Sequence, residues 1–305
     1  MKNTLKKLLT VLLCTFTLSV SAAEVITIIY GFSASDNSAN YSRNLANEAN
    51  SQQTKYKFLF DVRPGGGQAV AVNHVKNTRN TIFMTSGAFW LRPVFYPNES
   101  WDVNEWRTIM TQCSAPFSVA SVKYKSWNDV PKNQPLTIAT SGMGVFSHII
   151  ALQIVERYPN MTLIPFKSTV EGMLAVVSGQ VDFAVGFVGD QENWTHEETK
   201  TRLNILGTTG NGAGKYPSLA SQGFPQVLTK LDTPYNLMVP KSFDAGKAKE
   251  IRDILAKAET ATSVRKSYAL DFCAPISIPE NKLNAWFDEQ NKTIRNTTKG
   301  LTITQ

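Results

Sequence analysis

The sequence is poor in the residues and motifs on which enzymes, metal sites and disulfide-rich folds depend. Only three cysteines and three histidines occur in 305 residues, which excludes a small scaffold held together by disulfides. The histidines do not occur in the H-E-x-x-H spacing of a zinc site. The nucleophile pattern G-x-S-x-G, a P-loop and a dinucleotide-binding G-x-G-x-x-G are also missing. We therefore expect neither an enzyme nor a cofactor or metal site.

Long apolar runs are scarce as well, and the one clear example lies at the N-terminus. Lys2, Lys6 and Lys7 precede an uncharged apolar run at 8–20, and V-S-A-A follows at 20–23. This order is typical of a cleavable secretory signal at 1–23, which predicts export. Removing its three lysines lowers the net charge from +7 to +4. No basic cluster with interleaved aromatic residues remains, so nucleic acid is not an expected partner.

Export leaves two of the cysteines, Cys113 and Cys273, in the mature chain. Two cysteines in an oxidising compartment can form a disulfide. Two buried thiols that pack as small apolar side chains are the alternative. The spacing in the sequence does not decide between them, because pairing depends on the distance between the two Cα atoms.

The pattern of apolar residues predicts an alternation of strands and helices in a chain long enough for two domains. Expected strands are 25–30, 58–62, 81–84, 117–122, 136–139, 161–164, 181–185, 203–208 and 235–239. Expected helices are 40–51, 68–76, 146–157, 170–178, 247–261 and 280–293. The alternation is typical of parallel sheets covered by helices. We therefore expect an α/β fold made of two such units.

Small and polar residues gather in three loops that follow expected strands, at 32–37, 85–90 and 141–147. Ligands of open parallel sheets bind outside the carboxyl ends of the strands. Helix N-termini at that place offer free backbone N–H groups and suit an anion. Ordinary helix capping by Ser, Asp and Asn is the structural alternative for each single loop.

Six segments, taken in order, resemble the motifs of one protein family. They are the strand at 25–32, V-R-P-G-G-G at 62–67, S-G-M-G-V-F-S-H at 141–148, I-P-F-K at 164–167, G-Q-V-D at 179–182, and Y-P-S-L with Q-G-F-P within 216–225. Their order and spacing agree over essentially the whole mature chain. The sequence thus resembles the substrate-binding proteins of tripartite tricarboxylate transporters, the Bug family.

The resemblance implies a periplasmic protein with a periplasmic-binding-protein-like fold, in which two α/β domains enclose a ligand cleft. Domain 1 is expected at 24–117 and 235–305, and domain 2 at 118–234. The implied function is capture of a small carboxylate-type organic solute, an anion or a zwitterion. The domains would then close by a hinge motion and deliver the solute to a membrane permease of the tripartite tricarboxylate type. A sensing module that presents its solute to a membrane sensor kinase is the alternative.

The first loop departs from the family, since it reads S-A-S-D at 33–36 where the family has A-P-G-G. Asp36 places a negative charge where a ligand carboxylate is expected, which disfavours a diacid or attracts an ammonium group. Arg92 stands where the family often has Asn and can pair with a carboxylate, or it is structural. Phe32, Trp90, Phe146 and Phe166 make the cleft more aromatic, or they pack in the core.

The candidate ligand contacts are of three kinds: polar side chains, backbone N–H groups and apolar walls. We expect backbone N–H groups of Ser35, Gly144 and Val145 to point into the cleft, and Phe32 and Trp90 to form walls. The full set is Phe32, Ser33, Ser35, Asp36, Asn37, Ser86, Gly87, Trp90, Arg92, Ser141, Gly144, Val145, Ser147 and Phe166.

Overall fold

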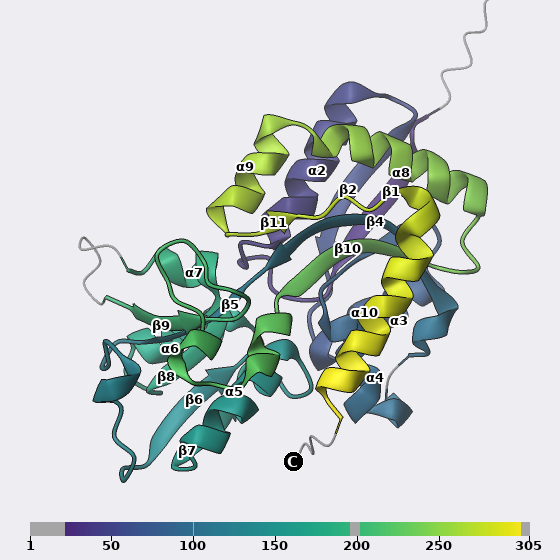
Figure 1. The fold of residues 1–305 in the computed structure, drawn as a ribbon. Coiled ribbons are helices and arrows are strands. Elements are labelled where there is room, and N and C mark those ends of the chain that lie inside the picture. The colour runs from purple at the N-terminus through teal and green to yellow at the C-terminus, as the bar shows by residue number, and fades with distance from the viewer. Residues whose placement is uncertain (1–21, 100, 196–201, 300–305) are drawn as a thin grey trace, which may run out of the picture.

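The strands form two separate sheets, each flanked by helices (Figure 1). The computed structural model describes residues 22–99, 101–195 and 202–299. This arrangement confirms the predicted α/β fold of two units. We call the part built on the first sheet the six-stranded half and the part built on the second the five-stranded half. The predicted signal peptide lies almost entirely outside the described residues.

The six-stranded half combines strands from both ends of the chain, in the order β11-β4-β10-β3-β1-β2. Their bounds are β1 Glu24–Tyr30, β2 Tyr56–Val62, β3 Thr81–Thr85, β4 Trp106–Ala115, β10 Thr233–Pro240 and β11 Ala274–Pro275. Strands β1, β2 and β3 are parallel, whereas β10 runs antiparallel to β3 and β4, and β11 antiparallel to β4. The expectation of a purely parallel sheet is therefore wrong.

The five-stranded half is mixed in the same way, with the order β7-β6-β8-β5-β9. The bounds are β5 Phe117–Ser121, β6 Leu136–Thr140, β7 Met161–Pro165, β8 Phe183–Phe187 and β9 Asn204–Thr208. Strands β6, β7 and β8 are parallel, and β5 is antiparallel to both β8 and β9. Antiparallel strands arise here because β5 and β10 carry the chain from one sheet to the other, and each enters its sheet from the side of the opposite half.

Helices pack against the sheets, and those of the six-stranded half lie on both of its faces (Figure 1). Their bounds are α2 Ala39–Gln52, α3 Ala69–Asn77, α4 Ala88–Phe95, α5 Phe146–Arg157, α6 Thr169–Val177, α7 Val188–Glu192, α8 Ala245–Glu259, α9 Thr262–Leu270 and α10 Leu283–Thr297. Side-chain caps fix two of these starts, because Ser168 Oγ accepts from the Glu171 N–H and Asp244 Oδ1 accepts from the Lys247 N–H. The long helices agree with prediction; α4, α7 and α9 were not predicted.

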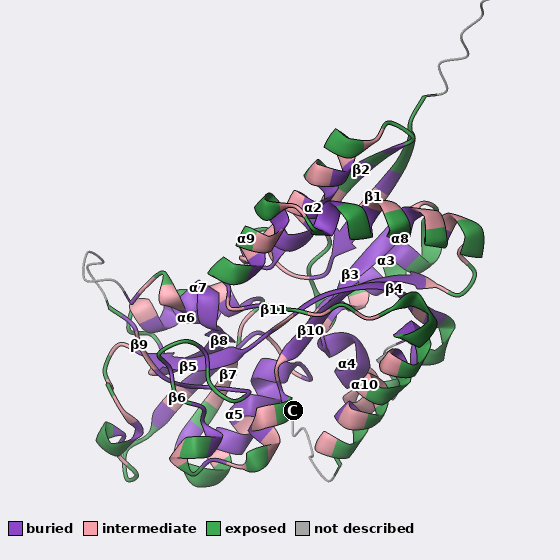
Figure 2. Cartoon of the chain, turned by 45° about the horizontal axis from the view of Figure 1, so that its top comes forward, coloured by how far each residue is buried: buried purple, intermediate pink, exposed green. Residues whose placement is uncertain are grey.

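The halves are in contact rather than apart. One cluster of buried apolar side chains extends from Ile26 in β1 to Phe183 in β8, and Figure 2 shows the strands of both sheets as largely buried. The chain passes between the sheets twice, directly from β4 to β5 through Pro116 and again between β9 and β10. The domain boundaries predicted at 117 and 235 stay predictions.

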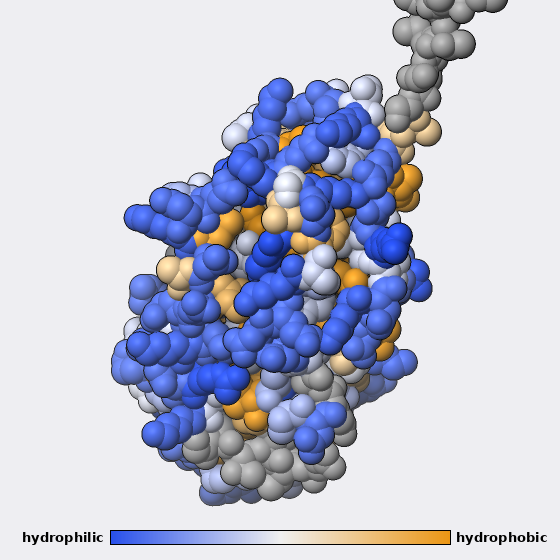
Figure 3. Space-filling view, turned by 90° about the vertical axis from the view of Figure 1, so that its right-hand side faces the viewer, coloured by the Kyte–Doolittle hydropathy of each residue, from blue (hydrophilic) through white to orange (hydrophobic). Residues whose placement is uncertain are grey.

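The surface is polar over the face shown in Figure 3, where hydrophobic residues occur only as small separate patches. Large hydrophobic side chains that are exposed are few among the described residues, and they lie on different elements: Val25, Leu59, Val70, Leu174 and Leu270. None of the described helices is long and apolar enough to cross a membrane.

Cys113 and Cys273 form a disulfide, which decides between the two alternatives left by the sequence. Their Cα atoms lie 5.4 Å apart, within the range that a disulfide requires. Cys113 lies in β4 and Cys273 directly precedes β11. The bond therefore fixes the segment after α9 to the sheet across 160 residues of chain.

We predict that the double variant Cys113→Ala/Cys273→Ala is destabilised by about 2–5 kcal/mol, because the cross-link restricts the unfolded chain. Urea unfolding of the oxidised wild type and the variant measures this difference. Wild type unfolded in the presence of a reductant is the control and should match the variant. Equal midpoints for all three samples would contradict the prediction.

Candidate functional site

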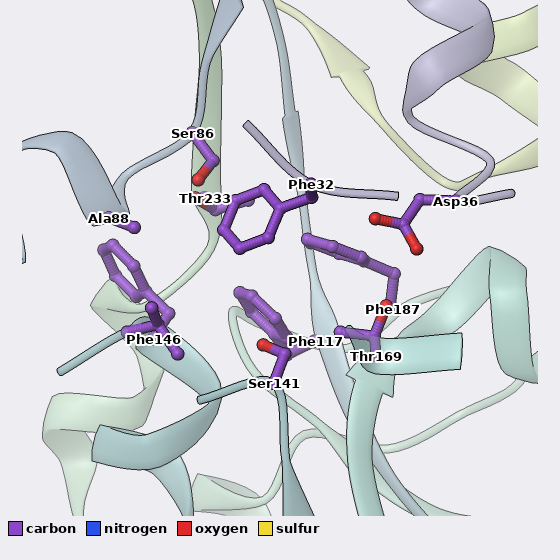
Figure 4. A pocket seen from close by; sticks show the side chains of 11 residues that line it. Phe32, Asp36, Ser86, Ala88, Phe117, Ser141, Phe146, Thr169, Phe187 and Thr233 are labelled. Atoms are coloured by element: carbon purple, nitrogen blue, oxygen red, sulfur yellow. The ribbon is translucent and has the colours of Figure 1, made fainter. Parts of the chain in front are cut away.

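The three predicted loops meet where the two halves face each other. They follow β1, β3 and β6, strands whose carboxyl ends point to the boundary between the halves. A small, partly open cavity lies there, with a volume of about 20 Å³, which is room for about one water-sized group. Figure 4 shows side chains from both halves around this space. Its lining residues are Phe32, Asp36, Ser86, Ala88, Phe117, Ser141, Val145, Phe146, Thr169, Phe187 and Thr233.

A larger groove adjoins the cavity and shares Phe32 and Ser141 with it. Its volume is about 600 Å³. Two cationic side chains line it from opposite halves: Arg92 from α4 and Lys167 from the loop after β7. The other lining residues are Gly31, Pro64, Gly65, Gly66, Gly67, Tyr96, Gly142, Met143 and Phe166. The groove therefore has the size and charge to hold a small organic anion.

The glycine triplet after β2 forms one wall of this groove through its backbone. Gly66 and Gly67 both have φ of +55°, in the left-handed region that favours glycine. A Cβ atom on Gly67 would lie 3.4 Å from Arg92 Nη1. The guanidinium of Arg92 in turn lies over the Tyr96 ring, 4.4 Å from its centroid. The positive φ angles rather than the space available thus favour glycine in this wall.

The loop at 141–147 is held by its own hydrogen bonds. The Ser141 N–H donates to Ser147 Oγ at 2.9 Å, and the two hydroxyl oxygens lie 2.8 Å apart. The Gly144 N–H donates to His148 Nδ1 at 3.1 Å. Burial lowers the pKa of His148 to about 4, so the imidazole is neutral and Nδ1 can accept this bond.

Two of the predicted backbone donors therefore already have partners inside the chain. The Gly144 N–H bonds to His148, and the Ser35 N–H donates to Ser33 Oγ at 3.2 Å. The expectation that these N–H groups point free into the cleft is wrong, because nearby side-chain acceptors satisfy them. Val145 lines the cavity.

The loop after β3 is similarly bound to its surroundings. Gln68 Nε2 donates to Ser86 Oγ at 2.8 Å, and the Gly87 N–H donates to Thr233 Oγ1 at 2.7 Å. A Cβ atom on Gly87 would lie 2.1 Å from Phe146 Cε2, which belongs to the five-stranded half. Glycine at this position lets the two halves pack closely.

Trp90 does not form a wall of the site, so the prediction that it lines the cleft is wrong. It is fully buried and packs against Phe89, Trp286 and Phe287, and it borders neither the cavity nor the groove. It lies in the first turn of α4, on the side of the helix that faces α10 rather than the opposite half. The walls instead include Phe117 and Phe187, which the sequence analysis missed because they looked like ordinary strand residues.

Three carboxylates are buried around the boundary between the halves: Asp36, Asp190 and Asp271. Asp190 belongs to α7 of the five-stranded half, accepts the Asn37 N–H at 3.0 Å, and accepts from Thr169 Oγ1 at 3.3 Å. Asp271 follows α9 in the other half and accepts from the Tyr41 hydroxyl. Loss of solvation raises the pKa of all three, and that of Asp36 to about 7.

Comparisons with known proteins agree with the fold. A scan against protein-family models and a search of curated proteins found no match. Among solved structures, the periplasmic binding protein BugD superposes with a TM-score of 0.78 at 16% identity, over 90% of this chain and 97% of that chain.

Two ligand-bound structures from Rhodopseudomonas palustris are similar to the same extent. One is a protein with adipate, with a TM-score of 0.79, 12% identity, and coverage of 90% of this chain and 96% of that one. The other is MatC with bound malate, with a TM-score of 0.77, 13% identity, and coverage of 90% and 99%. The chain therefore has the two-domain fold of periplasmic binding proteins.

We predict that the ligand-free protein loses stability as pH rises from about 4 to about 7. Asp36 stays protonated in the folded state up to its pKa of about 7, whereas it ionises near 3.8 when unfolded. Folding therefore binds a proton in this window, and stability falls by on the order of 1 kcal/mol per pH unit.

Urea unfolding at pH 5 and pH 8 measures this effect in wild type and Asp36→Asn. The variant should be more stable than wild type at pH 8 and nearly equal at pH 5. Asp288→Asn, which removes an exposed carboxylate on α10, is the control and should follow wild type. A variant less stable than wild type at pH 8 would show that the ionised Asp36 is favourable in the fold.

Proposed function

We propose that the protein is an extracytoplasmic solute receptor of the Bug type. It captures a small carboxylate-type organic solute in the groove between its halves and delivers it to a tripartite tricarboxylate-type membrane permease. The observation that carries the proposal is the groove of about 600 Å³, into which Arg92 and Lys167 face from opposite halves. One ligand carboxylate bound by both cations would hold the halves together.

The similar structures support the ligand class. BugD is a periplasmic binding protein, and the two R. palustris proteins hold adipate and malate, both dicarboxylates. The motifs that resemble the Bug family also fall at this site, since 62–67 and 141–148 supply two walls of the groove. The N-terminal pattern of a secretory signal supports a periplasmic location.

The geometry also supports a binding mechanism. Two sheets joined by two connections can rotate about those connections, and a ligand that contacts both halves favours the closed state. The two cations lie on separate halves, with Lys167 exposed and Arg92 buried. A ligand anion that contacts both of them favours closure, so closure depends on the solute.

We predict that Lys167→Gln weakens binding of the preferred carboxylate about three- to tenfold, because an ionic hydrogen bond is lost at an exposed side chain. Isothermal titration calorimetry with succinate, glutarate, adipate and the corresponding ω-amino acids identifies that solute and measures the change. Lys132→Gln, an exposed lysine in the loop before β6, is the control. Equal affinity of Lys167→Gln and wild type would place the anion elsewhere.

Delivery is tested in cells that carry the protein and its membrane partner. Uptake of the labelled solute should be lost when the gene for this chain is deleted and restored by wild type. Unchanged uptake together with a lost transcriptional response to the solute would favour presentation to a sensor kinase instead.

A further inference from the structure

The small cavity beside the groove has walls that differ sharply from those of an anion site. Four phenylalanine rings line it: Phe32 from the six-stranded half, and Phe117, Phe146 and Phe187 from the five-stranded half. Figure 4 shows these rings around one space. Phe117 lies 4.4 Å from Phe187 and 6.2 Å from Phe146 between ring centroids. Neither Arg92 nor Lys167 reaches into it.

The charged side chain that lines this cavity is Asp36, which is 3% exposed. Its carboxyl group points from the loop after β1 toward the Phe187 ring (Figure 4). The Oδ1 atom has no hydrogen-bond partner, and Oδ2 accepts a long bond of 3.4 Å from the Tyr30 hydroxyl. A backbone hydrogen bond from Ser33 lowers the pKa of Asp36 less than burial raises it. None of the ion pairs among the described residues involves Asp36.

A buried carboxylate with one unpartnered oxygen is unfavourable, because no hydrogen bond or opposite charge replaces the water at that oxygen. The other acids near Asp36 increase the cost. Negative charge on Asp271 or Glu171 raises the pKa of Asp36 further, and the neighbouring Tyr30 and Tyr235 are neutral, since burial raises their pKa values. The described residues that line the cavity thus include one acid and no cationic side chain.

These features are complementary to a small cation. Aromatic ring faces attract cations, and Asp36 Oδ1 is an available acceptor. The hydroxyl groups of Ser86, Ser141 and Thr169 also line the cavity and can accept further bonds. A volume of about 20 Å³ holds one water-sized group. A primary ammonium has this size and three donors, whereas a carboxylate would be too large and repelled by Asp36.

We propose that the cavity is an ammonium subsite, so that the solute is a zwitterion whose ammonium group binds Asp36 among the four rings. Its carboxylate lies in the adjoining groove between Arg92 and Lys167. The inference rests on the proposed function and narrows the solute class from carboxylates in general to amino carboxylates. The chain between the two groups passes Phe32 and Ser141, which border both spaces.

The test compares three ω-amino acids with the diacids in which a carboxylate replaces the ammonium group. The pairs are β-alanine with succinate, 4-aminobutyrate with glutarate, and 5-aminovalerate with adipate. Titration calorimetry of the wild type should show at least tenfold tighter binding of the amino acid in the best pair. Asp36→Asn should weaken that amino acid at least tenfold and leave its diacid unchanged or tighter.

Asp288→Asn is the control, because Asp288 is an exposed carboxylate on α10 that lines neither the cavity nor the groove; it should keep the preference for the amino acid. Tighter binding of the diacids to wild type, or equal binding of the amino acid to Asp36→Asn and wild type, overturns the ammonium subsite and leaves the receptor function standing. Binding of none of the six compounds contradicts the receptor function as well.

Discussion

The burial of carboxylates where the two halves meet is the constraint on which the site depends. Asp36 and Asp271 come from one half and Asp190 from the other, and all three are buried while the halves are packed together. Loss of solvation raises the pKa of each. When the halves close without a ligand, these carboxyl groups therefore bind protons. When they close around a cationic group, that cation takes the place of a proton. The packing of the two halves thus forms the site and also makes its stability depend on pH.

The strands, their loops and the disulfide position the two halves against each other. The parallel strands β1, β3 and β6 end at the boundary and present their loops there, while β4, β5 and β10 carry the chain between the halves. The disulfide holds the segment after α9 on the sheet, close to Asp271. Gly189 shows how closely α7 approaches this segment, since a Cβ atom there would lie 1.8 Å from Asp271 Oδ1. The two halves are therefore in close contact where Asp271 meets α7.

Much of the fold was predictable from the sequence, because runs of apolar β-branched residues indicate buried strands and apolar residues at helical spacing indicate the buried face of a helix. Strand β4 was missed because W-R-T-I-M-T-Q-C-S-A contains arginine, threonine and glutamine, although most of its residues are buried in the sheet. The antiparallel strands depend on contacts between distant segments, which local patterns do not contain. The disulfide was left open for the same reason.

The site was predictable only in part. The loops at 32–37 and 141–147 were identified from small polar residues after strands, and Asp36 from its departure from a family pattern. Trp90 was misplaced because one helical turn decides which way a side chain on α4 faces. Phe117 and Phe187 were missed because their role arises from the packing of two halves, and no local signal separates such residues from core.

Proton release on binding tests the central claim most directly. Titration of wild type with its preferred ω-amino acid at pH 7, in two buffers that differ in ionisation enthalpy, gives the number of protons exchanged. We predict a net release, because an ammonium group beside Asp36 lowers the pKa of a carboxyl that is partly protonated at this pH. The release should vanish in Asp36→Asn. A net uptake of protons by the wild type, or binding with no exchange, would contradict the account.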